Sequence, residues 1–183
     1  MNFRTLWRRA CMSLLLAIVT LDLAAGAELA AQSAGQTKPP GAIEPLGFLV
    51  GRWEASGGGK PGASSGAFAF EVEAGGRAML RHNESRSREG LHRDVMLIYA
   101  EGLGSLKATY ADSEGHVIRY TVSTPDAGSA VFMSDPTDPG PRFRLTYHLN
   151  DGVLAIRFEM TSPGDSVFST YLEGTARMQR PPK

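Results

Sequence analysis

The residues best suited to acid–base chemistry gather in one charged stretch, "RHNESRSREGLHRD", which runs from Arg81 to Asp94. It contains two histidines, His82 and His92, and a further acid, Glu84. A histidine paired with a carboxylate can act as general base and general acid near neutral pH, as an isomerase, hydratase or hydrolase requires. The alternative is a solvated hairpin whose charges pair across the strands, where each pair adds little stability.

The four histidines show no spacing typical of a metal site. His82, His92, His116 and His148 form neither H-x-H nor H-x-x-x-H, so only closure of the fold could gather them. The single cysteine, Cys11, lies near the N-terminus, so the rest of the chain offers no thiolate nucleophile or ligand. The sequence therefore predicts no metal site.

Two short motifs match catalytic or phosphate-binding signatures but lack the required context. "GASSG" (62–66) fits the G-x-S-x-G pattern, which needs a strand before Ser64 and a helix after it. Glycines precede it here, and the strand-like "AFAFEVE" follows. "GGGK" (57–60) is followed by Pro61, where a phosphate loop has Ser or Thr. We interpret the whole stretch "SGGGKPGASSG" as a mobile connection.

Three further residues are candidates for binding a ligand. Arg119, Arg157 and Tyr171 each lie in the middle of an expected strand. If their side chains point into the fold, they would anchor an acidic group of a ligand. If they point outward, they are ordinary surface residues, and the alternation alone does not decide between these orientations.

The elements that must position these residues are β-strands. In "VLAIRFEM", Leu154, Ile156 and Phe158 share one face, whereas Arg157 and Glu159 share the other, which is typical of a half-buried antiparallel sheet. A single helical turn near "PLGFLVG" competes with the first strand. We expect ten strands, at 48–56, 66–73, 77–86, 92–100, 105–112, 116–124, 129–134, 142–149, 153–161 and 166–178.

Short turns separate nearly all of these strands, and "NDG" (150–152) is the strongest hairpin signal among them. A meander of short hairpins must close or stack to protect its edges. The prediction is therefore an all-β fold, an antiparallel up-and-down β-barrel of about ten strands. A β-sandwich is the alternative, although it usually needs longer crossovers. Ten strands enclose more space than side chains fill easily, so a ligand cavity is expected.

The N-terminal residues have the features of a secretory signal peptide. "MNFRTLWRRA" is basic, "CMSLLLAIVTL" is a short apolar run, and "AGA" (25–27) fits the small-residue cleavage pattern. The apolar run is too short for a comfortable membrane span, and Asp22 interrupts it. We expect export to the periplasm or the extracellular space, with no stable membrane span after cleavage.

The expected organisation has three parts: a signal peptide at 1–27, a flexible linker at 28–44 and a barrel domain at 45–180. The linker sequence "ELAAQSAGQTKPPGAIE" is small, polar and contains prolines. The chain of 183 residues has a formal net charge of zero, so nothing points to nucleic acid as a partner. The sequence does not indicate an oligomeric state.

A Gly-x-Trp at the start of an all-β meander, here Gly51-Arg52-Trp53, resembles the lipocalin and fatty-acid-binding-protein group. The longer form "LGFLVGRWEASG" looks closest to the nitrobindin-like group of small bacterial ten-stranded barrels. The resemblance implies that Trp53 closes one end of the barrel and that an arginine of the last strand, Arg177, packs across it. Gly51, Trp53 and Arg177 are therefore expected to be structural residues.

The resemblance also implies a small hydrophobic or flat ligand inside the barrel. Nitrobindins bind haem through a histidine near the C-terminal end, but "VFSTYLEGTARMQR" contains none, and the last histidine is His148. No cofactor is therefore predicted, and haem stays open as an alternative that lacks its C-terminal-strand histidine. We expect an exported, non-enzymatic barrel that binds a small, mostly hydrophobic ligand. The alternatives are a barrel enzyme that uses His82 or His92 with a carboxylate, and an envelope structural or interaction protein.

Overall fold

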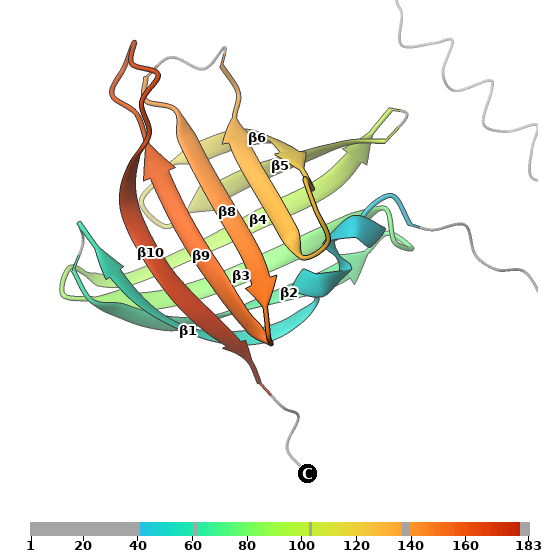
Figure 1. The fold of residues 1–183 in the computed structure, drawn as a ribbon, viewed down its shortest axis with the longest axis horizontal. Helices are drawn as coiled ribbons and strands as arrows, with labels where there is room; N and C mark the ends of the chain where they lie inside the picture. Colours follow the sequence, from blue (N-terminus) through green and yellow to red (C-terminus); the bar gives the residue numbers. More distant parts are fainter. Residues whose placement is uncertain (1–40, 61, 103, 137–139, 180–183) are drawn as a thin grey trace, which may run out of the picture. The chain divides into compact units, whose positions relative to one another are not determined.

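The computed structural model describes residues 41–60, 62–102, 104–136 and 140–179. The expected signal peptide, 1–27, and most of the expected linker lie outside the described residues. Ten antiparallel strands form a closed barrel (Figure 1). They are β1 (Gly51–Gly59), β2 (Ser64–Glu73), β3 (Ala78–Ser87), β4 (Gly90–Glu101), β5 (Ser105–Asp112), β6 (Val117–Ser123), β7 (Ser129–Ser134), β8 (Phe143–Asn150), β9 (Val153–Met160) and β10 (Ser169–Met178).

Each strand pairs with its neighbours in sequence, and the first strand pairs with the last. Trp53 of β1 lies opposite Met178 of β10 on one side and opposite Phe68 of β2 on the other. This pairing closes the sheet on itself and leaves no open edge, as an up-and-down barrel requires. The predicted barrel is confirmed, and the sandwich alternative is wrong.

The alternation seen in the sequence decides which side chains face inward. In β9, Leu154 is buried and Ile156 is half-buried, whereas Arg157 is exposed on the outer face. The turn between β8 and β9 has Asp151 at φ 50° and Gly152 at φ 74°, the conformation that a two-residue hairpin turn needs. The strongest hairpin signal in the sequence is therefore confirmed.

A short 3₁₀ helix, η1 (Glu44–Leu49), precedes β1, where the sequence left helix and strand in competition. Pro45 near its start fits the helix because its amide has no hydrogen to leave unsatisfied there. Leu46 and Leu49 are fully buried in the core. Ile43, the second-to-last residue of the expected linker, is also buried, so the packed domain begins slightly before the expected boundary.

The glycine-rich stretch after Trp53 is mostly strand, which corrects its interpretation as a mobile connection. Residues 56–59 belong to β1, and Gly57 lies opposite Gly174 of β10. A Cβ atom on Gly57 would come within 2.3 Å of the Glu173 carbonyl oxygen, and one on Gly174 within 2.6 Å of the Ser56 carbonyl oxygen. These glycines allow the backbones of β1 and β10 to approach closely where the barrel closes.

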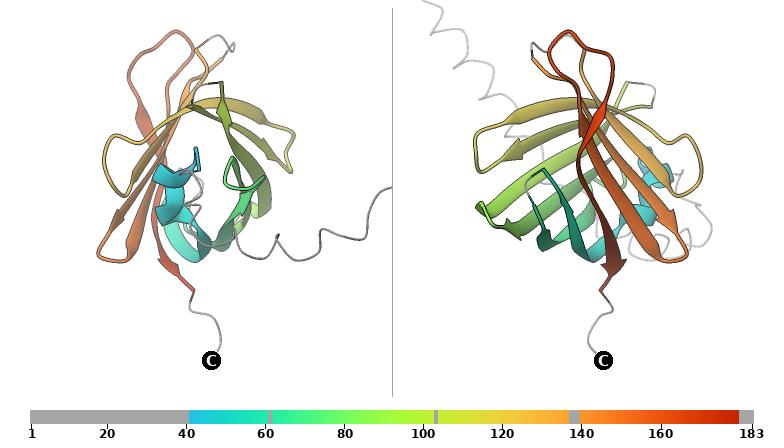
Figure 2. Two further views of the ribbon diagram at one scale, coloured as in Figure 1. Left: turned by 90° about the vertical axis from the view of Figure 1, so that its right-hand side faces the viewer. Right: turned by 60° about the vertical axis from the view of Figure 1, so that its left-hand side comes forward.

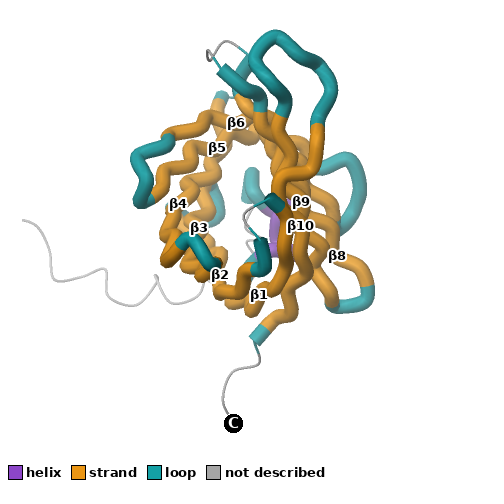
Figure 3. The backbone as a smooth tube through the Cα atoms, turned by 90° about the vertical axis from the view of Figure 1, so that its left-hand side faces the viewer, coloured by secondary structure: helices purple, strands orange, loops and turns teal. Residues whose placement is uncertain are grey.

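The inner face of the barrel is fully packed toward η1 and only partly covered toward the opposite end. Along β5, Leu106 and Ala108 are buried, whereas Tyr110 and Asp112 are half-buried. The inner faces of β9 and β10 change in the same direction. We call the end that carries η1 the closed end and the opposite one the open end. Views along the barrel show the strands as a ring, with η1 against its inside (Figures 2 and 3).

Trp53 lies at the closed end and is 1% exposed. Its Nε1–H donates a hydrogen bond of 2.8 Å to the Leu49 carbonyl oxygen, and its ring stacks on Phe68 at 6.3 Å between centroids. Gly51, two residues earlier, has φ 124°, which disfavours any residue with a side chain.

Among the described residues, no helix is long and apolar enough to cross a membrane.

Candidate functional site

A network of polar side chains covers the inner face of β3, β4 and β5, beginning at the middle of the barrel. Arg81 of β3 forms an ion pair with Asp94 of β4, and both side chains are less than 10% exposed (8% and 3%). The other terminal nitrogen of Arg81 donates a hydrogen bond of 2.5 Å to the hydroxyl of Tyr147 on β8. Arg81 therefore links two sides of the barrel interior.

Asp94 joins this pair to the residues nearer the open end. Its second carboxylate oxygen accepts a hydrogen bond of 2.7 Å from Asn83 Nδ2 and lies 3.3 Å from His92 Nε2. His92 and Asp94 are two residues apart on β4, so their side chains share the inner face. A histidine and a carboxylate thus lie within contact distance inside the barrel.

His92 continues the network to the turn between β5 and β6. Its Nδ1 lies 2.9 Å from Glu114 Oε1, and its Nε2 lies 3.2 Å from the hydroxyl of Tyr110. The Tyr110 hydroxyl also donates to Asp112 Oδ2 at 3.0 Å. Asp112 Oδ1 accepts backbone hydrogen bonds from Glu114 and His116, so it also holds the turn in place.

Burial and neighbouring charges shift the pKa of several of these groups. Burial lowers the pKa of Arg81, but Tyr147 and Asp94 raise it by more, so Arg81 stays charged. Burial lowers the pKa of His92 too, yet the hydrogen bond to Glu114 and the charges of Asp94 and Glu114 give a net rise. Burial and the charge of Asp94 raise the pKa of Tyr110, which keeps that hydroxyl protonated.

Asp112 shows the opposite shift. Burial alone would raise the pKa of this carboxyl group, but the hydrogen bonds from the His116 backbone and side chain and from Tyr110 lower it overall. Asp112 is therefore an anion at neutral pH. Together with Glu114 it places negative charge at the rim of the open end.

The opposite wall of the open end is apolar. Phe143 of β8 stacks on Phe158 of β9 with ring centroids 5.7 Å apart, and Tyr171 of β10 meets the edge of Phe158 at 6.1 Å. The half-buried residues Ile118, Ile156 and Leu172 occupy inner positions of β6, β9 and β10. The open end therefore has one polar wall, on β3, β4 and β5, and one apolar wall, on β6, β8, β9 and β10.

One buried polar atom in the site lacks a partner. The Nε of Arg81 has no hydrogen-bond partner among the described residues, although the side chain is buried. Buried donors are rarely left unsatisfied, and an exception at the base of an incompletely covered interior suggests a partner outside the protein, such as water or a ligand. Arg81 is thus the central residue of the candidate site.

The structure brings together only part of the residues that the sequence suggested. His92 faces the interior, whereas His82 is exposed on the outer face of β3 and lies opposite Val95. A catalytic pair built on His82 is therefore ruled out by the strand phase. Glu84, also on the outer face, forms an exposed ion pair with Arg93, as the solvated-hairpin interpretation expected.

The expected ligand anchors are distributed over both faces. Arg119 and Arg157 are exposed on the outer face, since their strand neighbours point inward, and Arg157 Nε lies 3.9 Å from Glu173 Oε2. Neither arginine can anchor a ligand inside the barrel. Tyr171 is half-buried at a bulge of β10 and belongs to the apolar wall.

The expected packing of Arg177 across Trp53 is also corrected. Arg177 lies opposite Glu54 and is exposed, whereas Trp53 and Ala176 are buried on the inner face. Successive residues of a strand point to opposite faces, so Arg177 cannot reach the indole. The buried contacts of Trp53 come instead from Phe68 and from the carbonyl group of Leu49.

The sequence interpretation missed Arg81, Tyr110, Asp112 and Tyr147. Tyr147 is on the apolar side of the alternating stretch "RFRLTYHL" (142–149), but nothing in the sequence connects it to Arg81, which lies 66 positions earlier. The signal that was present is the D-x-E-x-H spacing from Asp112 to His116, which sets three polar side chains around one tight turn.

No protein-family model matches the chain, and no curated protein sequence matches it. Solved structures do match. The crystal structure of Rv2717c from M. tuberculosis is 17% identical, with a TM-score of 0.57, and the match covers 76% of this chain and 98% of that chain. A de novo designed fluorescence-activating β-barrel is 12% identical, with a TM-score of 0.42, over 73% of this chain and 95% of that one. The comparison with Rv2717c supports the barrel fold and leaves the nitrobindin-like group a prediction.

Proposed function

We propose that the barrel binds a small amphipathic molecule in the open end of its interior. The polar end of the ligand would face β3, β4 and β5, and its apolar body would pack on β6, β8, β9 and β10. This proposal rests on the difference in burial between the two ends of the barrel interior. Inner side chains are fully covered near η1 but remain half-exposed at the open end. Ligand sites are typically apolar concavities with a few placed polar groups.

The polar wall limits the chemistry of the ligand. Arg81 is already neutralised by Asp94, so the site does not require a full anion. Its free Nε–H and the amide of Asn83 suit an acceptor such as a carbonyl, hydroxyl or carboxyl oxygen. The stacked rings of Phe143 and Phe158 suit a flat or aliphatic body. A mostly hydrophobic molecule with one oxygen-containing end fits both walls.

We also propose that the chain belongs to the nitrobindin-like group and that it is exported. The Gly51–Trp53 motif and the ten-stranded order support the former, and the basic and apolar N-terminal sequence supports the latter. Haem is not included. β10 contains no histidine, and His148 is exposed on β8, where its Nδ1 lies 2.7 Å from the Ser129 hydroxyl. These residues do not fit a haem held from the C-terminal strand.

A second candidate function is an enzyme that uses His92 with Asp94. The 3.3 Å contact between them and the raised pKa of His92 favour this candidate, because they supply an acid–base pair facing the interior. A His92→Gln variant would then lose turnover while retaining ligand binding. The envelope-interaction alternative has weaker support, since the charged pair of Arg93 and Glu84 interrupts the exposed apolar residues on the outer face of β4, which are Leu91, Val95 and Leu97.

Native mass spectrometry of the gently purified protein tests the binding proposal. The expected result is a bound small molecule, or saturable binding of long-chain fatty acids or flat aromatic acids. A protein that retains no ligand and binds none of these compounds would contradict the proposal. The same panel applied to Phe158→Ala, which removes part of the apolar wall, should give weaker binding, whereas Glu84→Gln on the outer face should not.

A further inference from the structure

We propose that the rim of the open end contains a binding site for a divalent first-row transition-metal ion. His92, Asp112 and Glu114 form its centre, and His116 is the fourth ligand. The ligand atoms of the first three residues lie within 4.8 Å of one another. The site lies on the polar wall but does not depend on the binding of an amphipathic ligand.

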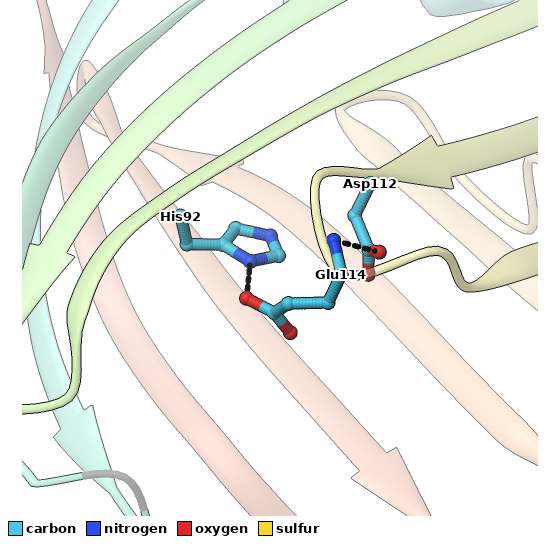
Figure 4. A group of neighbouring side chains, drawn as sticks. All are labelled: His92, Asp112 and Glu114. Carbon is cyan, nitrogen blue, oxygen red and sulfur yellow. Dashed lines mark hydrogen bonds and ion pairs between the residues drawn. The ribbon is translucent and has the colours of Figure 1, made fainter.

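The four side chains come from two places that the fold brings together. His92 lies near the start of β4, whereas Asp112 and Glu114 lie around the turn from β5 to β6 (Figure 4). His116 lies at the end of the same turn, one residue before β6. Asp94 of β4 lies opposite Asp112 of β5, so this register places His92 beside the turn. His92 and His116 therefore come together through strand pairing. For this reason they show neither the H-x-H nor the H-x-x-x-H spacing in the sequence.

The contact distances suit ligands of one ion. His92 Nδ1 lies 2.9 Å from Glu114 Oε1, and His116 Nδ1 lies 2.9 Å from Asp112 Oδ2. Glu114 Oε2 lies 3.8 Å from His116 Nδ1, so this carboxylate stands between the two rings. Ligand atoms bound to one tetrahedral zinc ion at 2.0–2.2 Å lie about 3.3–3.6 Å apart, between the 2.9 Å and 3.8 Å separations of these side chains. Small movements of the exposed Glu114 and His116 side chains would complete the site.

The donor set indicates the class of metal. Two imidazoles and two carboxylates provide nitrogen and oxygen ligands, which zinc and its neighbours accept, whereas calcium and magnesium prefer oxygen alone. The two carboxylates would balance the charge of a divalent cation. Asp112 Oδ1 is used by the backbone of the turn, so Oδ2, which also accepts from the Tyr110 hydroxyl, would bind the metal ion.

A second layer of residues already orients the ligands. With Nδ1 on the metal, His92 would donate its Nε2–H to Asp94 Oδ2, which lies 3.3 Å away and is fixed by Arg81 and Asn83. A carboxylate behind a histidine fixes the ring and its tautomer in many metal sites. The Tyr110 hydroxyl donates to Asp112 at 3.0 Å and does the same for that carboxylate. This support distinguishes the cluster from an incidental group of surface charges.

The test is a titration of the chelator-treated protein with Co²⁺, followed by visible absorption, and with Zn²⁺, followed by calorimetry. The wild type should bind one ion per chain. Glu114→Gln and His92→Gln should each weaken binding at least about tenfold, as the loss of a ligand or its support does. His82→Gln, which makes the same change as His92→Gln on the outer face of the neighbouring strand, should leave the affinity unchanged.

Circular dichroism would verify that each variant is folded, and Glu114, in an exposed turn, can be changed without disturbing the core. The absence of saturable binding by the wild type would overturn the proposal. So would equal affinity of the wild type and a folded Glu114→Gln variant, or an equal loss in His82→Gln. Binding of amphipathic compounds measured in the presence of chelator keeps the two proposals separate, because either can fail while the other holds.

Discussion

Arg81 of β3 and Asp94 of β4 are diagonal neighbours on the inner wall of the barrel. Arg81 lies opposite Met96 and Asp94 lies opposite Asn83, yet the guanidinium and the carboxylate form a buried ion pair. Diagonal positions across two strands are within reach of a long side chain. This pair fixes the base of the polar wall, and its burial makes each partner depend on the other.

Removing the charge of Asp94 should therefore be costly. In Asp94→Asn, Arg81 stays buried with its charge uncompensated, and we expect the free energy of unfolding to fall by about 3–5 kcal/mol. Urea denaturation measures this change. Glu84→Gln, which breaks the exposed pair with Arg93, should cost less than about 1 kcal/mol. Equal losses in the two variants would show that the Arg81–Asp94 pair is not effectively buried.

The close approach of β1 and β10 gives a second prediction. In Gly57→Ala, the new methyl group would lie 2.3 Å from the Glu173 carbonyl oxygen, so the backbone must move and the stability should drop by more than about 2 kcal/mol. Gly58→Ala is the matched control, because the nearest atom to its new methyl group, the Gly62 carbonyl oxygen, lies at an ordinary 3.6 Å. It should change stability by less than about 1 kcal/mol. Similar melting temperatures for both variants would mean that the two strands are less closely joined.

Trp53 gives a third prediction. Its removal in Trp53→Ala empties the closed end and leaves the Leu49 carbonyl without its hydrogen bond, so unfolding should become easier by about 3–5 kcal/mol. Val117→Ala, at a position that is 61% exposed, should have little effect. A Trp53→Ala protein that melts like the wild type but loses a ligand would assign Trp53 to the binding site.

The pH dependence of stability should include a contribution from Glu159. Hydrogen bonds from Arg144 lower the pKa of Glu159 below its ordinary 4.5, against the effect of burial. A carboxyl group whose pKa is lower in the folded state stabilises the fold above the unfolded pKa, and this contribution is lost as pH falls through the folded pKa. Glu159→Gln should therefore flatten the loss of stability below about pH 4.5, whereas Glu71→Gln, at an exposed position, should not. The measurement is the free energy of unfolding of the wild type and of both variants between neutral and acidic pH. If Glu159→Gln loses stability with falling pH as steeply as the wild type does, the Arg144–Glu159 pair contributes nothing.

The strands were predictable because turn residues and alternation agree along most of the chain. The strands at 105–112 and 129–134 match the prediction at both ends, and the others differ by a few residues. The start of β1 was misplaced because the apolar run before Trp53 fits a buried helical turn as well as a strand. Leu49 is buried as the last residue of η1, although the predicted strand 48–56 already included it.

The site was harder to predict because the phases of β3 and β4 are hidden in the sequence. β4 has apolar residues on both faces, since Met96 and Ile98 are buried whereas Val95 and Leu97 are exposed. The open-end half of β3 is polar on both faces, so the pattern does not show that Arg81 points inward. Only the closed barrel, with β3 and β4 in register, decides that His92 is internal and His82 external.

The most direct test of the binding account compares two tryptophan substitutions at adjacent positions of β9. Ile156 is a half-buried inner residue of the apolar wall, and Ala155 is exposed on the outer face. The measurement is the affinity for an amphipathic fluorescent probe, 8-anilinonaphthalene-1-sulfonate, with folding verified by circular dichroism. If the ligand occupies the open end, Ile156→Trp should abolish probe binding, and Ala155→Trp should bind like the wild type. Equal binding by both folded variants would contradict an interior site.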